Sequence, residues 1–429
     1  LIFPNTVLWL GYGWILITLM AFGVLRVLAF LSRLKDRVGR RRPEAPIAAE
    51  PLPVVSIMVP LHGEDAILPS LIERLSASEY PVELLDICLV LEAGDTRTHA
   101  ALARLNLPPW FRAITVPASP LRTKPRAMNY ALGFCKGSFI GIYDAEDAPE
   151  RDQIHRMVDL FAKTGPEVAC IQGYLDFYNA RRNWLARCFT IEYAIWFRVI
   201  LHGIERLDLP VPLGGTTVFF RRTALESLGA WDAHNVTEDA DLGFRLARLG
   251  YRCAFLATTT REEANCRLVP WIRQRSRWLK GYAMTWVTHM RNPAALWRDL
   301  GAWRFLAFQV LTLGTISNFV LAPVIWSLWL VSLGFNPAYT DLLPWSAWSL
   351  LGTSFVLSEI ILFVIGVFAV SGRAHRHLIP WVVTMPIYWP LATLAAYKAL
   401  FEVIVKPHYW DKTSHGHLSG GERPEKAAA

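Results

Sequence analysis

The sequence predicts an α/β domain with a doubly wound, Rossmann-like mixed sheet, joined to an α-helical membrane region with amphipathic helices at the membrane surface. Long apolar runs occupy the start and the last third of the 429 residues, whereas the middle has the composition of an ordinary globular protein. In the middle, short apolar runs alternate with helical patterns, which is typical of a sheet covered by helices. A basic, tryptophan-bearing stretch then separates the middle from the last third, as expected at a membrane surface.

Charge and cysteine content exclude several other classes of protein. The net charge is +8, and much of it lies beside the apolar runs. An anionic lipid surface explains this charge more simply than a nucleic acid does, so we expect no nucleic-acid partner. The six cysteines are scattered and form no C-x-x-C pair. This favours a reduced, cytosolic compartment over a disulfide scaffold or a zinc site.

Residues 1–32 are predicted to form a transmembrane helix. Residues 7–30 are apolar almost throughout and are long enough to cross a bilayer. No small-residue cleavage site follows them, so we expect an anchor rather than a signal peptide. Residues 33–52 form a basic linker, and the positive-inside rule then places the residues that follow in the cytoplasm.

Residues 53–265 are predicted to form the α/β domain. Apolar runs that indicate strands, and helical patterns, follow one another along this part of the chain. The expected strands are 54–60, 87–91, 113–116, 139–143, 218–220 and 252–256, and the expected helices are 67–77, 124–134, 184–201 and 236–251. Several strands end in acidic residues, and such sheets bind ligands at the carboxyl ends of their strands.

Residues 266–405 are predicted to lie at or in the membrane. Amphipathic interfacial helices are expected at 266–300, and transmembrane or re-entrant helices at 301–405. Residues 348–370 form a clean span, whereas the apolar run 306–333 contains Pro323. Residues 378–405 contain three prolines, so they either cross the membrane, dip back or lie in the interface. Residues 406–429 form a carboxyl-terminal tail.

Two acidic strand ends are candidate ligand sites. Asp144, Glu146 and Asp147 place three carboxylates within four positions. Mg²⁺ or Mn²⁺, bound together with a diphosphate, would relieve their repulsion. Glu92 and Asp95 follow another strand and suit hydrogen bonds from a nucleoside. In each case a solvated acidic turn is the alternative.

Two helix starts carry further candidate residues. Lys124 opens one helix, where a cation and the helix end together suit an anion, with ordinary surface charge as the alternative. Thr237 is expected to cap another helix, and Glu238 and Asp239 suit the positive end of its dipole. Taken alone, this second stretch is most simply a capped helix with solvated acids.

The basic stretch presents a third kind of site. Gln274, Arg277 and Trp278 fall at positions i, i+3 and i+4, so they share one helix face. That face offers a hydrogen-bonding amide, a guanidinium that suits a diphosphate, and a flat ring on which a sugar can stack. A membrane-surface helix is the alternative interpretation, and both can hold at once.

In this order and spacing, the acidic strand end, the T-E-D stretch at 237–239 and the Q-x-x-R-W stretch at 274–278 form a strong signal. From about Pro53 to Trp286 the chain resembles the membrane-embedded family 2 glycosyltransferases of the GT-A fold, the group that contains cellulose, hyaluronan and curdlan synthases. The resemblance implies that Glu92 and Asp95 contact the nucleoside and that Asp239 is the general base. It implies that Asp144, with Glu146 or Asp147, holds a metal ion and the diphosphate.

The same resemblance implies roles for the remaining motifs. Arg277 would contact the diphosphate, and Lys412 would do so from a gating segment in the tail. The acceptor would be bound by five residues: Gly214, Gly215, Thr216, Gln274 and Trp278.

By this resemblance the chain is expected to be an inverting enzyme that elongates a β-linked polysaccharide from a UDP-sugar, with UDP-glucose as the expected donor and Mg²⁺ or Mn²⁺ as cofactor. It would translocate the product across the inner membrane, as a multi-pass protein with a cytosolic catalytic domain, alone or with export partners or as a homo-oligomer. One alternative is a transferase that adds a single sugar to a polyprenyl phosphate or another lipid. A second is a channel or transporter subunit, which leaves the ordered acidic motifs unexplained.

Overall fold

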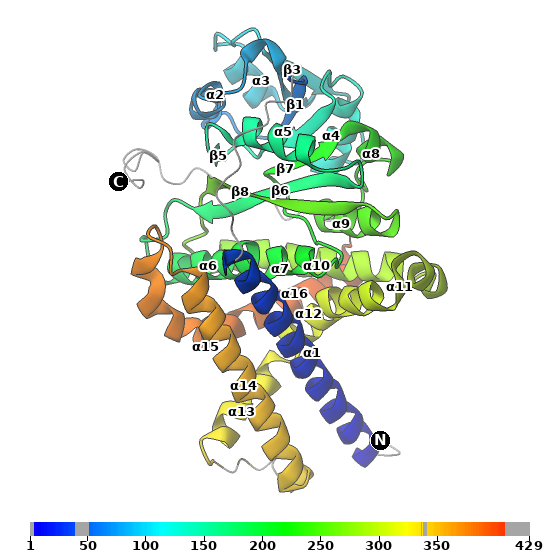
Figure 1. Ribbon diagram of the computed structural model, residues 1–429, viewed down its shortest axis with the longest axis vertical. Helices are drawn as coiled ribbons and strands as arrows, with labels where there is room; N and C mark the ends of the chain where they lie inside the picture. The colour runs from blue at the N-terminus through cyan, green and yellow to red at the C-terminus, as the bar shows by residue number, and fades with distance from the viewer. Residues whose placement is uncertain (1–3, 39–50, 336, 338–340, 408–429) are drawn as a thin grey trace.

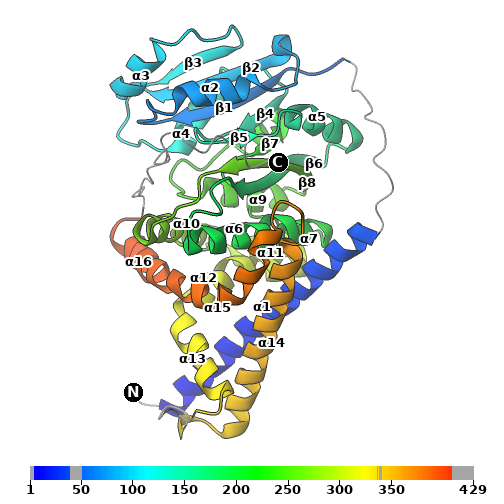
Figure 2. The ribbon, with the colours of Figure 1, turned by 90° about the vertical axis from the view of Figure 1, so that its left-hand side faces the viewer.

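The computed structural model describes residues 4–38, 51–335, 337 and 341–407. The chain is stacked in layers, with the sheet and its covering helices at the top (Figures 1 and 2). Helices α6 (Trp184–Ile195), α7 (Leu201–Arg206) and α10 (Leu268–His289) lie in a layer beneath the sheet. The long helices α1 (Pro4–Val38) and α14 (Trp345–Ala369) extend away from that layer.

Eight strands form one mixed sheet in the order β3-β2-β1-β4-β7-β6-β8-β5. Strands β3, β2, β1 and β4 are parallel neighbours, and β6 is parallel to β8. β7 is antiparallel to β4 and β6, and β5 is antiparallel to β8. The predicted α/β class with a mixed sheet is confirmed, and β7 and β5 supply the antiparallel pairs. The strands are β1 (Val55–Leu61), β2 (Leu85–Glu92), β3 (Phe111–Val116), β4 (Phe139–Ile142), β5 (Ala148–Pro149), β6 (Val168–Phe177), β7 (Val218–Arg221) and β8 (Arg252–Glu262).

The sequence did not predict β5 or β6, and β6, the longer of these two strands, is buried along its whole length. It escapes a pattern search because Gln172, Gly173 and Asp176 interrupt its apolar run. The fold satisfies both buried polar side chains, as burial requires. Gln172 donates to the backbone oxygens of Thr216 and Thr217 at 3.0 and 3.1 Å, and Asp176 pairs with Arg198 at 2.9 Å.

Helices cover both faces of the sheet because successive strand residues point to opposite sides. Ile57 and Val59 of β1 belong to one buried apolar cluster, together with α2 (Leu68–Ser76) and α5 (Gln153–Lys163). Met58, between them, belongs to a second cluster on the other face. That cluster also contains residues of α4 (Lys124–Leu132), α6 and α9 (Glu238–Arg248). Two short helices, α3 (Thr96–Leu102) and α8 (Arg222–Ser227), complete this part.

Three helices of the described chain are long and apolar enough to cross a membrane: Thr6–Lys35, Trp345–Ala369 and Arg376–Val405. Their number rises to four if the bent pair Pro293–Val320 and Ala322–Ser332, which meet at 65°, counts as one span. Pro323 lies in the first turn after this break, where a helix tolerates proline. α7 packs closely against α1 at Gly203. A Cβ on this glycine would lie 2.3 Å from the backbone oxygen of Ala29, so the close approach requires a residue without a side chain.

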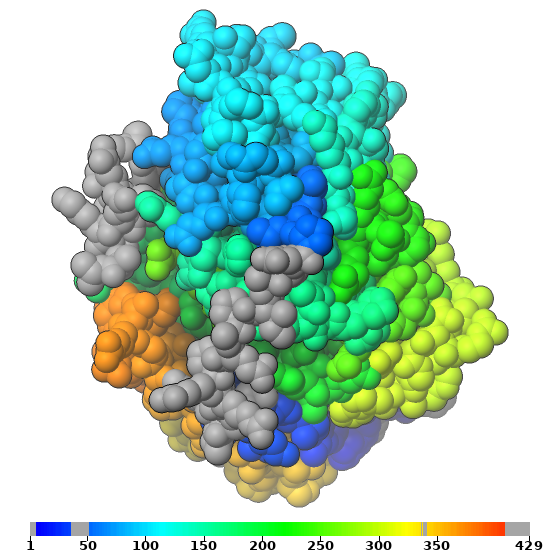
Figure 3. All heavy atoms as spheres, turned by 45° about the horizontal axis from the view of Figure 1, so that its top comes forward, coloured from blue at the N-terminus to red at the C-terminus, as the bar shows by residue number. Residues whose placement is uncertain are grey.

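The elements of the last third lie below the sheet (Figure 1). α11 (Pro293–Gln309) is interrupted at Gly301, which has φ of 70°, and it projects at the side of the molecule (Figures 1 and 3). α12 (Thr315–Val320) and α13 (Ala322–Ser332) follow it. The segment after α14 contains the 3₁₀ turns 376–384, α15 (Met385–Tyr388) and α16 (Ala392–Val405), which packs against α10.

Candidate active site

A cavity of about 370 Å³ lies where the carboxyl ends of the strands meet the starts of α4 and α9, and α10 also contributes to its lining. This volume falls in the range of ligand pockets. The strand ends β2, β4 and β8 contribute Glu92, Asp144, Glu146 and Glu262. The helices contribute the remaining residues: Lys124 from α4, Thr237, Glu238 and Asp239 from the start of α9, and Gln274, Arg277 and Trp278 from α10.

Lys124 is the cation at the centre of this cavity. Thr123 caps α4 by accepting a hydrogen bond from the amide of Arg126 at 3.4 Å, which places Lys124 in the first turn. Its Nζ donates to Asp144 Oδ1 at 2.5 Å and to the backbone oxygen of Gly215 at 2.9 Å. Burial disfavours the ammonium, but the carboxylates of Asp144 and Glu238 outweigh burial and raise the pKa of Lys124. Lys124 is therefore charged at neutral pH although it is buried.

Glu238 and Asp239 open α9 and face this cation. A Cβ on Gly215 would lie 3.1 Å from Asp239 Oδ2, so the absence of a side chain at Gly215 makes room for that carboxylate. Burial and the Asp239 carboxylate raise the pKa of Glu238 to about 7. Burial also raises the pKa of Asp239, against the opposing effects of an amide of the helix start and Lys124. A carboxylate with a raised pKa is a stronger base.

Thr237 has a different role from the one predicted. It occupies the N-cap position of α9, but its hydroxyl makes no capping bond, and Oγ1 is buried without a partner among the described residues. The reason is packing: a Cβ on Gly281 of α10 would lie 2.0 Å from Thr237 Oγ1. Thr237 is therefore the point at which α10 meets the start of α9.

The predicted metal ligands are Asp144 and either Glu146 or Asp147, and of these three residues Asp144 and Glu146 line the cavity. Within the described residues no three His, Cys, Asp or Glu side chains lie close enough to hold a metal ion. Asp147 is fully buried and does not line the cavity, because its carboxylate accepts from the Thr216 hydroxyl and from the Asp144 amide at 2.8 Å.

Asp144 and Glu146 line the cavity and fit a divalent cation shared with a diphosphate, since Mg²⁺ commonly takes one or two carboxylates plus substrate phosphates. Burial and the nearby Asp144 carboxylate raise the pKa of Glu146 to about 7, which a bound cation would reverse.

Of the two acids predicted to contact a nucleoside, one lines the cavity and the other does not. Glu92 lines the cavity and pairs with Arg126 at 3.2 Å. Asp95 does not line the cavity but caps α3, accepting from the amide and hydroxyl of Thr98 at 3.2 and 2.6 Å and from the amide of Gly63 at 2.6 Å. Burial would raise its pKa, yet these hydrogen bonds lower it. Asp95 therefore shapes the loop beside the site.

The predicted acceptor residues mostly come together. Gly215, Thr216, Gln274 and Trp278 line the cavity. Gly214 does not, because its amide donates to Gln172 Oε1 at 2.9 Å inside the fold. Lys412 lies outside the described residues.

Sequence reasoning missed Glu262, the last residue of β8. Its carboxyl lines the cavity, and Oε1 is buried without a hydrogen-bond partner among the described residues. Burial, followed by the charges of Asp147, Glu146 and Asp144, raises the pKa of Glu262. The rule that acids at strand ends mark a site would have found it. The predicted strand was too short, ending at residue 256.

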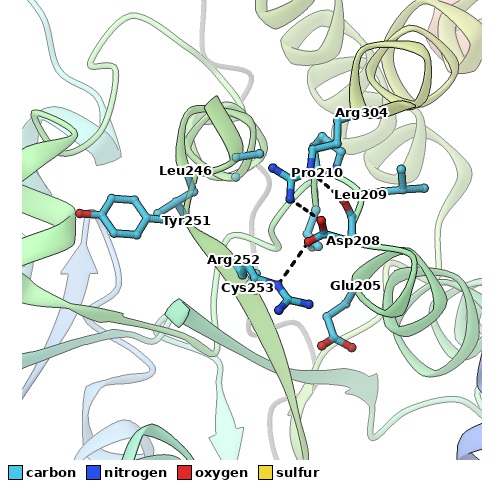
Figure 4. A pocket seen from close by; sticks show the side chains of 12 residues that line it. Glu205, Asp208, Leu209, Pro210, Leu246, Tyr251, Arg252, Cys253 and Arg304 are labelled. Carbon is cyan, nitrogen blue, oxygen red and sulfur yellow. Dashed lines mark hydrogen bonds and ion pairs between the residues drawn. The ribbon is translucent and has the colours of Figure 1, made fainter. Parts of the chain in front are cut away.

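A second hollow, of about 20 Å³, lies between α7, α9 and α11 (Figure 4). This volume has room for about one water molecule. Asp208 pairs there with Arg252 at 3.2 Å and with Arg304. This cluster joins α11 to the sheet and is a structural contact rather than a ligand site.

Comparison with known protein families identifies one family whose model matches this chain. The family described as "Glycosyl transferase family group 2" matches residues 139–398. Beta-monoglucosyldiacylglycerol synthase of Trichormus variabilis is 27% identical over 286 residues, which cover 64% of this chain and 59% of the relative. Cellulose synthase 1 of Komagataeibacter xylinus is 28% identical over 277 residues, which cover 62% of this chain and 17% of the relative. The chain spans about half the length of the curated relatives that head the comparison.

A solved structure supports the fold. The mannosyltransferase of Pyrobaculum calidifontis, in complex with GDP-Man and Mn²⁺, matches with a TM-score of 0.54 at 19% identity. The match covers 90% of this chain and 98% of the other. At this identity the likeness concerns the fold alone.

Proposed function

Because the chain belongs to glycosyl transferase family group 2, we propose that it is an inverting, membrane-bound enzyme that transfers a sugar from a UDP-sugar to a hydroxyl group. One observation carries the proposal. The Asp239 carboxylate and the Lys124–Asp144 pair meet at Gly215, in a cavity that Trp278 also lines. A base, a cation for a diphosphate and a sugar-stacking ring therefore share one site.

In this proposal each residue acts through its position. Lys124 and Arg277 bind the diphosphate, and Glu92 lies where the nucleoside would sit. Asp144 and Glu146 would hold Mg²⁺ or Mn²⁺, which helps neutralise the departing diphosphate. Asp239 accepts the proton of the acceptor hydroxyl as that oxygen attacks the anomeric carbon. Attack opposite the leaving group converts an α-linked donor into a β-linked product.

The first candidate acceptor is a growing β-glycan elongated from UDP-glucose. The Q-x-x-R-W residues support it, since Gln274, Arg277 and Trp278 line the cavity together. In this form the sheet domain faces the cytosol, and α1, α14 and the segment Arg376–Val405 lie in the inner membrane. Translocation would use these helices, alone or with partners.

A second candidate is transfer of one sugar to a membrane lipid. The similarity to beta-monoglucosyldiacylglycerol synthase extends over 59% of that relative, against 17% of cellulose synthase 1. In addition, Arg275 and Phe189 pack against the Trp278 ring, so this ring joins the cavity to the helix layer along which a lipid would approach.

One assay tests the proposal and separates the candidates. Purified protein in lipid nanodiscs receives radiolabelled UDP-sugars with Mg²⁺ or Mn²⁺, in the presence of diacylglycerol or β-glucan oligosaccharides. A ladder of lengthening glycans supports the polymer, and a single-sugar lipid supports the second candidate. Failure to release UDP from any donor would refute glycosyl transfer.

Activity is expected to depend on pH through the raised pKa values of Glu238 and Asp239. A raised pKa keeps a carboxyl protonated at higher pH, so the base becomes available only as the pH rises through it. We expect kcat/KM to fall about tenfold per pH unit on the acid side of the pKa of Asp239, which burial moves to higher pH. Glu238→Gln removes the neighbouring charge and should move this limb to lower pH. A profile that stays flat from about pH 5 to pH 8 would contradict this assignment.

Removal of divalent cations is expected to abolish transfer, and added Mg²⁺ or Mn²⁺ should restore it. Asp144→Asn should raise the cation concentration needed for half-maximal activity by about tenfold or more, because one of two carboxylate ligands is lost. Asp147→Asn is the control variant for the cation requirement. Its carboxylate lies inside the fold, so this variant should lower the free energy of unfolding without changing the cation requirement. Full activity after chelation would disprove the cation site.

A further inference from the structure

Arg275 lies within the Q-x-x-R-W stretch but faces away from the cavity. Its side chain is 7% exposed and does not line the cavity. The guanidinium forms a two-pronged ion pair with Glu192 of α6, in which Nη1 donates to Oε1 at 2.5 Å and Nη2 donates to Oε2. Its Nε is buried and has no hydrogen-bond partner among the described residues. The orientation of Arg275 therefore depends on groups that contact its two Nη atoms.

Tyr388 of α15 completes this contact. Its hydroxyl donates to Glu192 Oε2 at 2.6 Å and accepts from Trp271 Nε1 at 3.0 Å and from Arg275 Nη2 at 3.3 Å. Tyr388 is fully buried. We call Arg275, Glu192, Tyr388 and Trp271 the rear network.

The rear network supports the ring that faces the acceptor. The Arg275 guanidinium carbon lies 5.1 Å from the centre of the Trp278 ring and 4.9 Å from that of Trp271. A cation at this distance from an aromatic ring holds it by electrostatic attraction. Trp278 also contacts Phe189 and Tyr193 of α6, with ring centres 6.1 and 6.3 Å away. Trp278 is thus held by Arg275 and by two rings of α6, of which Tyr193 also lines the cavity.

The rear network also links the acceptor side of the site to the membrane segment. Tyr388 belongs to the candidate span Arg376–Val405, whose residues Val383 and Ile387 are 66% and 61% exposed. Apolar side chains with this exposure are suited to contact with lipid. On the donor side of the cavity, Glu92 pairs with Arg126, and Lys124 binds Asp144 and the backbone oxygen of Gly215, so these contacts lie outside the rear network.

We propose that Glu192 and Tyr388 are positioning residues for acceptor binding. They hold Arg275, and through Arg275 the Trp278 ring, in an orientation that depends on the position of the segment 376–388 at the membrane. This inference rests on the proposed function and deepens it. Acceptor affinity then depends on the rear network, whereas donor binding does not.

Tyr388→Phe tests the proposal because it removes one hydroxyl and leaves the ring in place. We expect the acceptor KM to rise about tenfold, as for loss of a hydrogen bond to a charged group. The KM for the UDP-sugar and the slow, acceptor-independent hydrolysis of the donor should not change. Tyr397→Phe is the matched control, since the Tyr397 hydroxyl donates to the backbone oxygen of Val320 at 3.1 Å, outside the network. Equal changes in donor and acceptor constants, or no change in either, would overturn the proposal.

A second measurement does not depend on activity. Protein labelled with 5-fluorotryptophan gives a ¹⁹F resonance for Trp278, assigned by its loss in Trp278→Phe. Tyr388→Phe and Glu192→Gln should shift or broaden this resonance, and Tyr397→Phe should leave it unchanged. An unmoved resonance in both network variants refutes the positioning role. If wild-type protein hydrolyses or transfers no UDP-sugar, the proposed function fails, while the ¹⁹F result still decides whether the network holds Trp278.

Discussion

Replacing Asp239 with asparagine is expected to reduce sugar transfer by about 10²–10⁴-fold, the usual contribution of a positioned general base. The amide has nearly the same shape as the carboxylate but cannot accept the acceptor proton at neutral pH. Gly215 should still accommodate it, because a Cβ there would lie 3.1 Å from Asp239 Oδ2. Donor binding should persist, since Lys124 and Asp144 keep their contact.

The measurement pairs two readouts on Asp239→Asn. Transfer is followed with labelled UDP-sugar, and UDP affinity is followed by titration calorimetry. Asp152→Asn serves as the control, because that carboxylate is 46% exposed at the start of α5 and does not line the cavity. Glu238→Gln should lose less transfer than Asp239→Asn, since its neighbour retains the base. Transfer at the wild-type rate by Asp239→Asn would eliminate Asp239 as the base.

Gly281→Ala is expected to impair both stability and transfer. Its Cβ would lie 2.0 Å from Thr237 Oγ1, so α10 and the start of α9 must separate. We expect a loss of about 1–3 kcal/mol in the free energy of unfolding, as for other overpacked sites. We also expect transfer to fall by at least about tenfold, because Asp239 and Trp278 lie on the two helices that move apart.

The direction of the change in the free energy of unfolding separates the effect of the close contact from that of helix propensity. Within a helix, glycine-to-alanine normally stabilises by about 1 kcal/mol. A net loss at Gly281 therefore reports the contact with Thr237 rather than helix propensity. Gly133→Ala at the end of α4 is the control, since the nearest atom to its Cβ would be 3.8 Å away. A Gly281→Ala protein that unfolds at or above the wild-type temperature and keeps full activity would contradict the close approach.

The sequence by itself determined the fold class, the family and most of the cavity. Its evidence was local: apolar periodicity located β1, β2 and α9, and acids at the ends of parallel strands indicated Glu92 and Asp144. Spacing at i, i+3 and i+4 correctly placed Gln274, Arg277 and Trp278 on one side of α10. These inferences succeed because helix and strand geometry fix directions over a few residues.

Only the tertiary structure decided which polar groups face the cavity. Asp95 and Asp147 look like ligands in the sequence, but hydrogen bonds from Gly63 and Thr216, which are distant in the chain, turn both carboxylates into the fold. Glu262 joins the site only because β8 runs on beside β6. The same holds for Glu192 and Tyr388, which meet Arg275 across 83 and 113 positions. A buried carboxylate or guanidinium must find a partner, and for these residues the partner is set by packing between remote segments rather than by local sequence.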